Sequence, residues 1–408
     1  MLRAGEAQRP MSQAQPHHLA LDAQALREAV EAHQRYLAGR SGGRRLSLTY
    51  ADLSNTTLEG LDLREADFAG ANFHGATLAR ANLTRGILFG SDLREADIRR
   101  ANLTKADLRG ANLAGAELPG CDLREGRIAL QDKLDGFRIL RHEHRPGELN
   151  YAILSGANLA GAQMNGAVAM SSDFTDANLS GAMLAGAKLT RAVLDGADLS
   201  GADLAGADLS GASMKRTVLA GANLAHATLE DVDMSDVLGE PPQNVMVEDR
   251  PLAEVLDEHE AYCDSAGAKG SVVPLIGLDF RPVRSLEGRR LTALVARAGV
   301  FFGMNLMGAQ LQGADLSACD FRGADLRDAD LRGAKLVGAS FTRADLRGAK
   351  LGPLMIAEGR FVRTDFTRAL LRNANLAGAH AQRARFLEAD MTGANLNGCD
   401  LTDAELEV

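Results

Sequence analysis

The sequence contains no tryptophan, and aromatic residues make up only 4% of the 408 residues. Hydrophobic residues still account for 46% of the chain, and the abundant residues are Ala, Leu and Gly. Large aromatic side chains normally fill much of a broad globular core. Their scarcity argues against such a core and favours a narrow interior lined by Leu and Ala.

Several motifs that carry chemistry are also missing. The sequence has no P-loop, no HExxH zinc motif and no CxxC pair. Outside the repeats described below, no stretch is long enough for a catalytic domain. We therefore expect a protein that is not an enzyme and that holds no cofactor and no resident metal ion.

Basic residues are not in excess. The chain has 45 Lys and Arg residues against 54 Asp and Glu residues, which gives a net charge of -9. Proteins that bind nucleic acid directly need a surplus of Lys and Arg to contact phosphates. The charge predicts no direct nucleic-acid binding and leaves open a protein partner that is itself basic.

Long apolar runs are absent as well. The most apolar window, LTALVARAGVFFGMNLMGA, is interrupted by Arg297 and Asn305. Residues 1–18 contain Pro and Gln and no apolar core of signal-peptide length, so we expect a disordered lead. These features predict a cytoplasmic protein without a membrane span.

The sequence does contain a repeat of five residues. Every fifth residue is non-polar from Leu48 to Ile128, again from Leu154 to Met234 one residue out of phase, and again from Leu286 to Leu406. We call this residue the centre of its unit; a small residue stands two positions before most centres. A period of five fits neither an α-helix nor a flat strand. It predicts a chain that turns a corner every five residues, so that four units close a square coil.

The stretches ANLTKADLRGANLAGAEL and GADLRDADLRGAKL resemble the A(D/N)LxX units of the pentapeptide repeat family. The resemblance implies an all-β solenoid, a right-handed quadrilateral β-helix with centres and small residues pointing inward. Its specificity for function is poor. Three of the four cysteines stand at the small position and are predicted to be reduced core residues: Cys121, Cys319 and Cys399.

The breaks in the repeat predict two β-helices, each preceded by a short amphipathic helix. His33-x-x-Tyr36 and His259-x-x-Tyr262 lie on the two helices, which indicates an internal duplication. We interpret these four residues as parts of structural caps that cover the open end of each β-helix. The expected segments are a lead (1–18), a cap (19–45), β-helix 1 (46–236) with an inserted loop (131–151), a linker (237–250), a second cap (251–275) and β-helix 2 (276–408).

The inserted loop 131–151 is a candidate contact surface for a partner, because loops that leave a regular scaffold often carry function. Its best anchors are Phe137, Arg138, Arg141 and Arg145. The pair His142 and His144 suggests a metal site more weakly, since no third ligand stands nearby. A loop that is simply solvated is the alternative.

Some proteins of this family are thought to mimic DNA and to bind type II topoisomerases, a role that would require acidic columns along the β-helix. Positions twenty apart should stack on one face, and the best such column is Asp325, Asp345 and Asp365. Arg327 and Arg347 flank it and would neutralise it. We therefore favour a non-catalytic protein–protein interaction scaffold over a DNA mimic that binds DNA gyrase or protects it from fluoroquinolones.

The repeat continues in register to the C-terminal AELEV, with no following segment to cover the last coil. An uncovered strand edge recruits other chains. This predicts an isologous homodimer through the C-terminal end, at Leu396, Leu401 and Leu406. Similar dimers form through the C-terminal coils of quinolone-resistance proteins of this family. The identity of the protein partner does not follow from the sequence.

Overall fold

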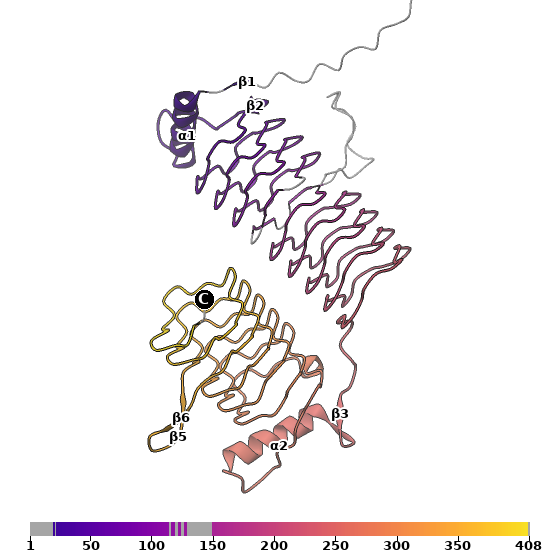
Figure 1. Cartoon of the computed structure of the whole chain (residues 1–408), viewed down its shortest axis with the longest axis vertical. Coiled ribbons are helices and arrows are strands. Elements are labelled where there is room, and N and C mark those ends of the chain that lie inside the picture. The colour runs from indigo at the N-terminus through magenta and orange to yellow at the C-terminus, as the bar shows by residue number, and fades with distance from the viewer. Residues whose placement is uncertain are drawn as a thin grey trace, which may run out of the picture. The chain divides into compact units, whose positions relative to one another are not determined.

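The computed structural model describes residues 19–20, 22–113, 116–118, 121–123, 126–128 and 149–406. The chain divides into two compact units, Met1–Leu238 and Gly239–Val408. Each unit contains one α-helix followed by a stack of coils (Figure 1). Each unit also has a separate core of buried Leu, Ala and Phe residues.

Four five-residue units make one coil, and parallel bridges join residues twenty positions apart. Examples are Asp62 with Asn82 and Asn82 with Asn102. Most centres donate their amide hydrogen to the next coil along the chain, as Leu83 does to the carbonyl of Asn102 at 2.6 Å. The amide before it bonds downward, as Asn82 does to the carbonyl of Leu61 at 2.8 Å. Successive coils are therefore held like strands of a parallel sheet.

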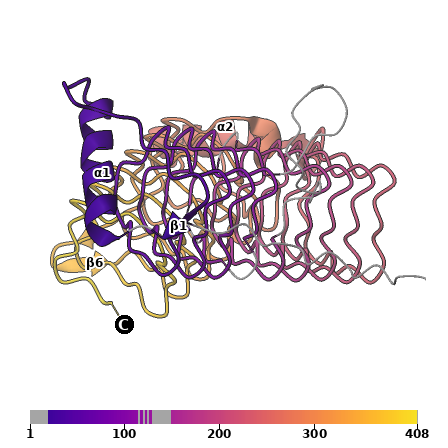
Figure 2. The same cartoon turned by 90° about the horizontal axis from the view of Figure 1, so that it is seen from above.

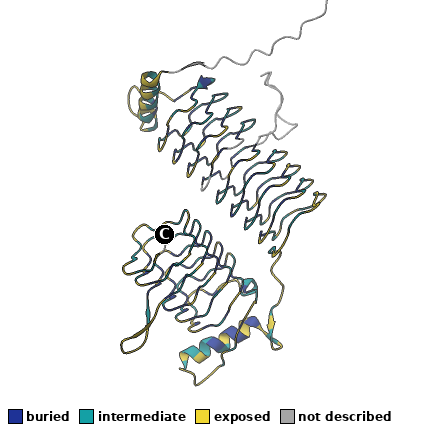
Figure 3. Cartoon of the chain, in the orientation of Figure 1, coloured by how far each residue is buried: buried dark blue, intermediate teal, exposed yellow. Residues whose placement is uncertain are grey.

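The unit chemistry explains this geometry. The centre and the small residue two positions before it point inward, and both are buried in most coils (Figure 3). The Asp or Asn before the centre closes the corner, because its side chain accepts the amide hydrogen two residues on. The amide of His74, for example, lies 3.1 Å from Oδ1 of Asn72. Burial of each leucine contributes about 1.5–3 kcal/mol to the stack.

In the first unit, helix α1 (Ala23–Leu37) lies across the end of the stack (Figure 2). We expected helix from residue 19, but Leu19–Ala20 forms strand β1, which pairs in parallel with β2 (Ala51–Asp52). Asp22 starts the helix because its carboxylate accepts the amide hydrogens of Gln24 and Ala25. Leu26, Ala29 and Val30 pack against the core.

The second unit begins with two short paired strands, β3 (Met246–Val247) and β4 (Arg250–Pro251). Helix α2 (Leu252–Asp264) follows directly and buries Leu252, Val255 and Leu256. A single 3-10 turn, η1 (Arg281–Val283), precedes the regular coils. A hairpin of β5 (Leu354–Ala357) and β6 (Arg360–Val362) interrupts them. No helix in the described part of the chain is long and apolar enough to cross a membrane.

The insertion in the first unit ends earlier than the sequence suggested. Leu149 is already a buried centre, and its amide bonds the carbonyl of Val168 at 2.7 Å. Glu117 pairs with Ile153 instead of the residue twenty positions on, so the ladder continues across the insertion. The end of the expected loop 131–151 is therefore wrong, because residues 149–151 belong to the coil.

Substituting a centre tests the register. We expect Leu103→Asp to destabilise the first unit by about 3–5 kcal/mol, because Leu103 is 1% exposed and a buried carboxylate would have no cation there. The measurement is the unfolding free energy by urea denaturation of the full chain. Arg100→Asp, at an exposed corner with a positive φ of 57°, is the matched control and should change stability by less than about 0.5 kcal/mol. Equal stability of the two variants would contradict the inward placement of Leu103.

Candidate interaction surfaces

The β5–β6 hairpin exposes four large apolar side chains on the second unit: Met355, Ile356, Phe361 and Val362. Leu354 pairs with Val362, and Met355 pairs with Phe361 directly across the two strands. Leu354 faces the stack, so Met355 and Phe361 lie on the opposite, outward side. Met355, Ile356 and Phe361 are 64%, 53% and 51% exposed. Exposed residues of this size mark interaction surfaces more often than chance.

The base of the hairpin is fixed to the stack. The hydroxyl of Thr364 is buried, lies 2.9 Å from the carbonyl of Gly352 and accepts the amide hydrogen of Gly333 at 3.0 Å. Leu354 then lies on Gly333, where an added Cβ would be 2.6 Å from the Cβ of Leu354. Only glycine allows this close approach. These contacts hold the hairpin at a defined place on the side of the coil stack.

The sequence did not reveal this hairpin. The five-residue period predicts Ile356 and Phe361 to be buried centres, but the structure shows that both are exposed. The insertion is ten residues long, which preserves the phase of the period. The available signal was weaker: Pro353 interrupts the pattern, and Leu354 stands where a small residue normally precedes the centre.

The hairpin also overturns the predicted acidic column. Asp325 pairs with Asp345 as expected, but Asp345 then pairs with Asn375, not with Asp365. Asp365 pairs with Lys335 on another face. The ten inserted residues move every later unit by two faces of the four-sided coil. The column of Asp325, Asp345 and Asp365 is therefore wrong, and only its first two members stack.

The two stacked carboxylates are neutralised locally. Arg327 and Arg347 lie two residues after Asp325 and Asp345, and in each pair a guanidinium nitrogen is 2.6 Å from a carboxylate oxygen. The hydrogen bond from the Arg327 side chain lowers the pKa of Asp325. The same pairing recurs at other Asp-Leu-Arg sequences of the described chain, as at Asp92 with Arg94 and Asp330 with Arg332.

Asp365 belongs to a column of alternating charge. Its members, in stacking order, are Asp315, Lys335, Asp365, Arg385 and Glu405. Nη1 of Arg385 lies 3.5 Å from Asp365, and Nε lies 2.8 Å from Glu405. Neighbouring coils thus present opposite charges at this face, a favourable arrangement for side chains that stack directly.

The two cap helices place a buried histidine against the first coils. Nδ1 of His33 accepts the amide hydrogen of Leu46 at 3.1 Å, so Nε2 carries the proton and donates to the carbonyl of Arg64 at 3.0 Å. His259 donates in the same way from Nε2 to the carbonyl of Thr292 at 3.1 Å. Burial is the main cause that lowers the pKa of both histidines below 6.5.

The surroundings of the two histidines are alike in further respects. Tyr36 stacks on His33 with ring centroids 5.8 Å apart. Gly43 lies against the backbone of Tyr36, and Gly270 lies against the backbone of Tyr262, each too close for a Cβ. Tyr36 and Tyr262 are 40% and 41% exposed. The same constellation in both units agrees with an internal duplication.

The predicted anchors of the contact loop belong to a part of the chain that the structure does not describe. Phe137, Arg138, Arg141 and Arg145 lie outside the described residues, as do His142 and His144. Within the described ranges, no group of three or more His, Cys, Asp or Glu residues is arranged to hold a metal ion. All four cysteines are free thiols, and Cys121 and Cys319 are buried in the small position.

The centres of the last described coil are less buried than those of the coil before it. Leu396 and Leu401 are partly exposed and Leu406 is 44% exposed, whereas Leu376 and Ala381 one coil earlier are fully buried. In the described part of the chain, no element lies over this coil as α2 lies over the other end of the unit.

These features define a class: a β-solenoid with four five-residue units in each coil, ion-paired side chains on its faces and a hairpin that leaves the coils of the second unit. The chain belongs to the pentapeptide repeat family, whose members fold as right-handed quadrilateral β-helices. The family description "Pentapeptide repeats" matches eight copies that together span more than half of the chain: residues 47–85, 87–125, 152–191, 172–211, 197–236, 305–343, 324–352 and 364–403.

Solved structures of the same family are similar to this chain. HetL, involved in heterocyst differentiation regulation in Nostoc sp. strain PCC 7120, is 32% identical over 47% of this chain and 77% of its own, with a TM-score of 0.34. Rfr23 from Cyanothece 51142 is 26% identical over 32% and 91%, with a TM-score of 0.30. A trypsin-treated variant of QnrB1, a plasmid-mediated fluoroquinolone resistance protein, is 18% identical over 48% and 90%, with a TM-score of 0.27. A search of curated protein sequences gives no significant match.

The buried histidines make the caps sensitive to acid. Because the folded state lowers their pKa below 6.5, the unfolded state takes up protons more readily. The stability they contribute is present above about pH 6.5 and is lost as the pH falls below that value. We expect hydrogen exchange of α1 and α2 to rise between about pH 7.5 and 5.5, after correction for the intrinsic pH dependence of exchange.

The variant His33→Gln with His259→Gln should exchange faster at neutral pH and lose this pH dependence. His226→Gln, at an exposed histidine of the first unit, is the matched control and should behave as wild type. A wild-type profile without extra exchange at low pH would contradict the neutral, hydrogen-bonded state of the two rings.

Proposed function

We propose that this protein is a non-catalytic protein–protein interaction scaffold built on rigid β-helical rods. The observation that carries the proposal is the β5–β6 hairpin, which exposes the large apolar side chains of Met355, Ile356 and Phe361. A rod that serves only as a spacer has no use for three exposed large apolar side chains.

The way in which the hairpin is mounted supports a contact role. Thr364 and Gly333 fix its base, so its apolar face is presented without the entropic cost of ordering a free loop. Arg360 and Arg363 flank Phe361, and all three lie on or beside β6. Aromatic and arginine residues together are typical of the centres of protein interfaces.

A DNA-mimicking inhibitor of a type II topoisomerase is the alternative function. Mimicry requires rows of uncompensated negative charge that imitate phosphates. In the second unit the stacked carboxylates Asp325 and Asp345 are each paired with an arginine, and Asp365 lies on a face of alternating charge. These arrangements favour the scaffold over the mimic.

The hairpin can be removed without breaking the coil. Deleting residues 353–362 returns the spacing of bridged residues from thirty to the usual twenty, as between Lys335 and Asp365. We expect the variant to keep its circular dichroism spectrum and to melt within about 4 °C of wild type. It should lose, by at least about ten-fold, the binding of the proteins that wild type captures by affinity purification.

A second variant controls for indirect effects of the deletion. Met355→Ser with Phe361→Ser keeps the hairpin and removes only its outward cross-strand pair. Capture of the same proteins should fall in parallel with the deletion. Unchanged capture by both variants would refute the hairpin as the contact surface.

The alternative function has a direct test. We expect no inhibition of DNA supercoiling by purified gyrase, and no protection from a fluoroquinolone, when the protein is added in large excess. The physical reason is that the two stacked carboxylates of the second unit, Asp325 and Asp345, are each paired with an arginine. Inhibition that disappears in the variant Asp325→Lys with Asp345→Lys would instead establish mimicry through these two carboxylates.

A further inference from the structure

One side of the first unit has a cation at each of four neighbouring corners. Arg80 and Arg85 stand at the two ends of this side in one coil, and Arg100 and Lys105 stand at the same places in the next coil. All four side chains are exposed. We call the side between these four corners the basic face.

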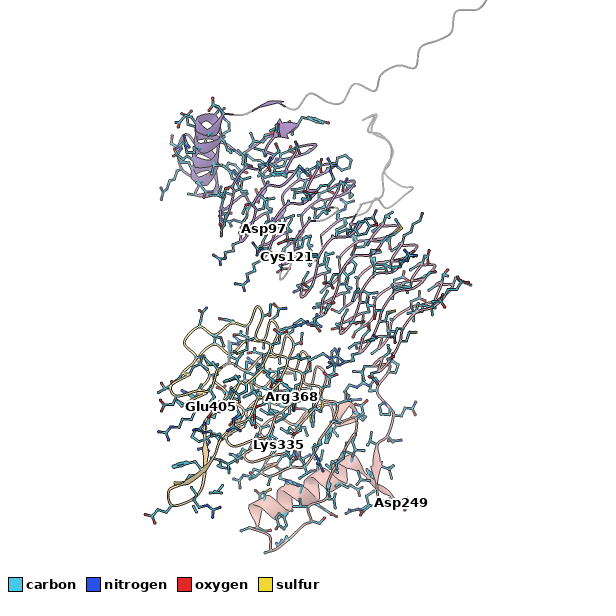
Figure 4. The ribbon with its side chains drawn as sticks, in the orientation of Figure 1. Asp97, Cys121, Asp249, Lys335, Arg368 and Glu405 are labelled. Carbon is cyan, nitrogen blue, oxygen red and sulfur yellow. The ribbon has the colours of Figure 1, made fainter. Side chains whose placement is uncertain are left out.

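The other cations of the same stretch are already paired. Residues 79–105 contain six Lys and Arg residues against three Asp and Glu residues, although the whole chain has a net charge of -9. Asp92 pairs with Arg94 at 2.6 Å. Asp97, labelled in Figure 4, pairs with Arg99 at 2.7 Å on the adjoining side of the coil. The local surplus of positive charge therefore belongs to the basic face.

Carboxylates lie beside the basic face and compensate it only in part. Nη1 of Arg80 lies 3.7 Å from Oε1 of Glu59. Glu65 occupies the corner one coil before Arg85, but no ion pair joins these two side chains. Neither Arg85 nor Arg100 forms an ion pair with another described residue. Two of the four corners are thus available to pair with another molecule.

The middle of the basic face is uncharged. Its corner-closing residues are Asn82 and Asn102. The same column holds Asp62 in the coil before them and Asp122 in the coil after them. Closing the corner needs only a side-chain oxygen, and the amide of Thr84 lies 3.2 Å from Oδ1 of Asn82. The two asparagines therefore keep the local structure and omit the carboxylates that would neutralise the corners.

The composition of the basic face indicates which anion it would bind. Guanidinium groups pair with carboxylates through charge-assisted hydrogen bonds, and the two coils present them about 4.8 Å apart along the axis. Nucleic acid is disfavoured, because the face has no aromatic side chain on which a base could stack. The net charge of -9 also opposes binding to a long polyanion. Carboxylates on an extended protein segment match the face better.

We propose that the basic face of the first unit binds an acidic segment of a partner protein. This inference rests on the proposed scaffold function and supplies the chemistry of one partner. The hairpin belongs to the second unit and the basic face to the first. Variants of one surface leave the other intact, so failure at the basic face and failure at the hairpin are distinguishable.

The test measures binding of an acidic peptide to the full chain by fluorescence anisotropy. The probe is a fluorescein-labelled peptide of about twelve residues in which Glu alternates with Ser, so that an extended chain projects its carboxylates to one side. The control peptide has Gln in place of Glu. We expect wild type to bind the Glu peptide at least about ten-fold more tightly at about 0.05 M salt, with a marked loss at about 0.5 M, because exposed charges are screened.

The variant Arg85→Glu with Arg100→Glu reverses the two corners that have no ion pair in the described chain. Glutamate suits these corners, because Glu65 and Glu95 already occupy such positions with φ of 63° and 57°. We expect the variant to melt within about 4 °C of wild type. It should bind the Glu peptide at least about ten-fold more weakly.

The variant Arg85→Gly with Arg100→Gly keeps the test decisive if the reversed variant is unstable. Both positions have a positive φ of 57°, which glycine adopts without strain. This variant removes the charge without adding a carboxylate, and its binding of the Glu peptide should also fall by at least about ten-fold. Unchanged binding by either folded variant would overturn the proposal.

The matched control reverses two exposed cations on other sides of the same unit, Lys188→Glu with Arg191→Glu. Its net charge equals that of the variant Arg85→Glu with Arg100→Glu, and it should bind the Glu peptide as wild type does. An equal loss in the control would show attraction to the net charge of the chain and refute the basic face as the site. Equal binding of the Glu and Gln peptides by wild type would refute it as well.

Two further measurements address other occupants of the basic face. A fluorescein-labelled oligothymidylate of about twelve nucleotides should bind more weakly than the Glu peptide. Tighter binding that is lost in Arg85→Glu with Arg100→Glu would assign the face to nucleic acid and overturn the proposal. Sedimentation velocity compares self-association of wild type and this variant, and we expect no difference. Self-association of wild type that the variant abolishes would make a second copy the occupant and overturn the acidic partner.

Discussion

The hydrogen bonds between residues twenty positions apart are the constraint on which the whole structure depends. They hold most centres directly over the centre of the neighbouring coil, so that the inward side chains pack in continuous stacks. In the second unit this stacking aligns Phe280, Phe301 and Phe321 with ring centroids 4.2 and 4.8 Å apart. An inserted segment is tolerated only if the chain returns to the ladder at its far side. Both insertions do so: Glu117 pairs with Ile153, and Lys335 pairs with Asp365.

Much of this architecture could be predicted because one local unit determines it. A centre, a small residue and a corner-closing Asp or Asn recur at fixed offsets. The type of each residue indicates whether its position is buried or lies at a corner of the coil. The cap helices follow from their apolar faces and from the paired His-x-x-Tyr motifs. The start of the first helix was misplaced because Asp22, which caps it, lies within a stretch whose apolar residues continue on both sides.

The candidate surfaces were less predictable, for a physical reason. Periodicity reports phase within a unit but not which of the four faces a unit occupies. An insertion of ten residues leaves the phase of Phe361 and Asp365 unchanged while moving the first out of the core and the second to another face. Contacts between coils are hard to predict for the same reason. The column from Asp315 to Glu405 joins residues that are not evenly spaced in the sequence. By contrast, the pairing of Asp325 with Arg327 was predictable, since only two residues separate them.

Because every coil has the same size, the number of residues between two features of one β-helix sets both their separation along the axis and their relative orientation. Adding five residues turns whatever follows by a quarter of a revolution, and adding twenty residues advances it by about 4.8 Å along the axis with its bearing unchanged. The hairpin of the second unit therefore lies at a distance and an angle from helix α2 that depend on the number of units between them. Gain or loss of whole units would move the hairpin along or around the β-helix in fixed steps and leave the hairpin itself unchanged.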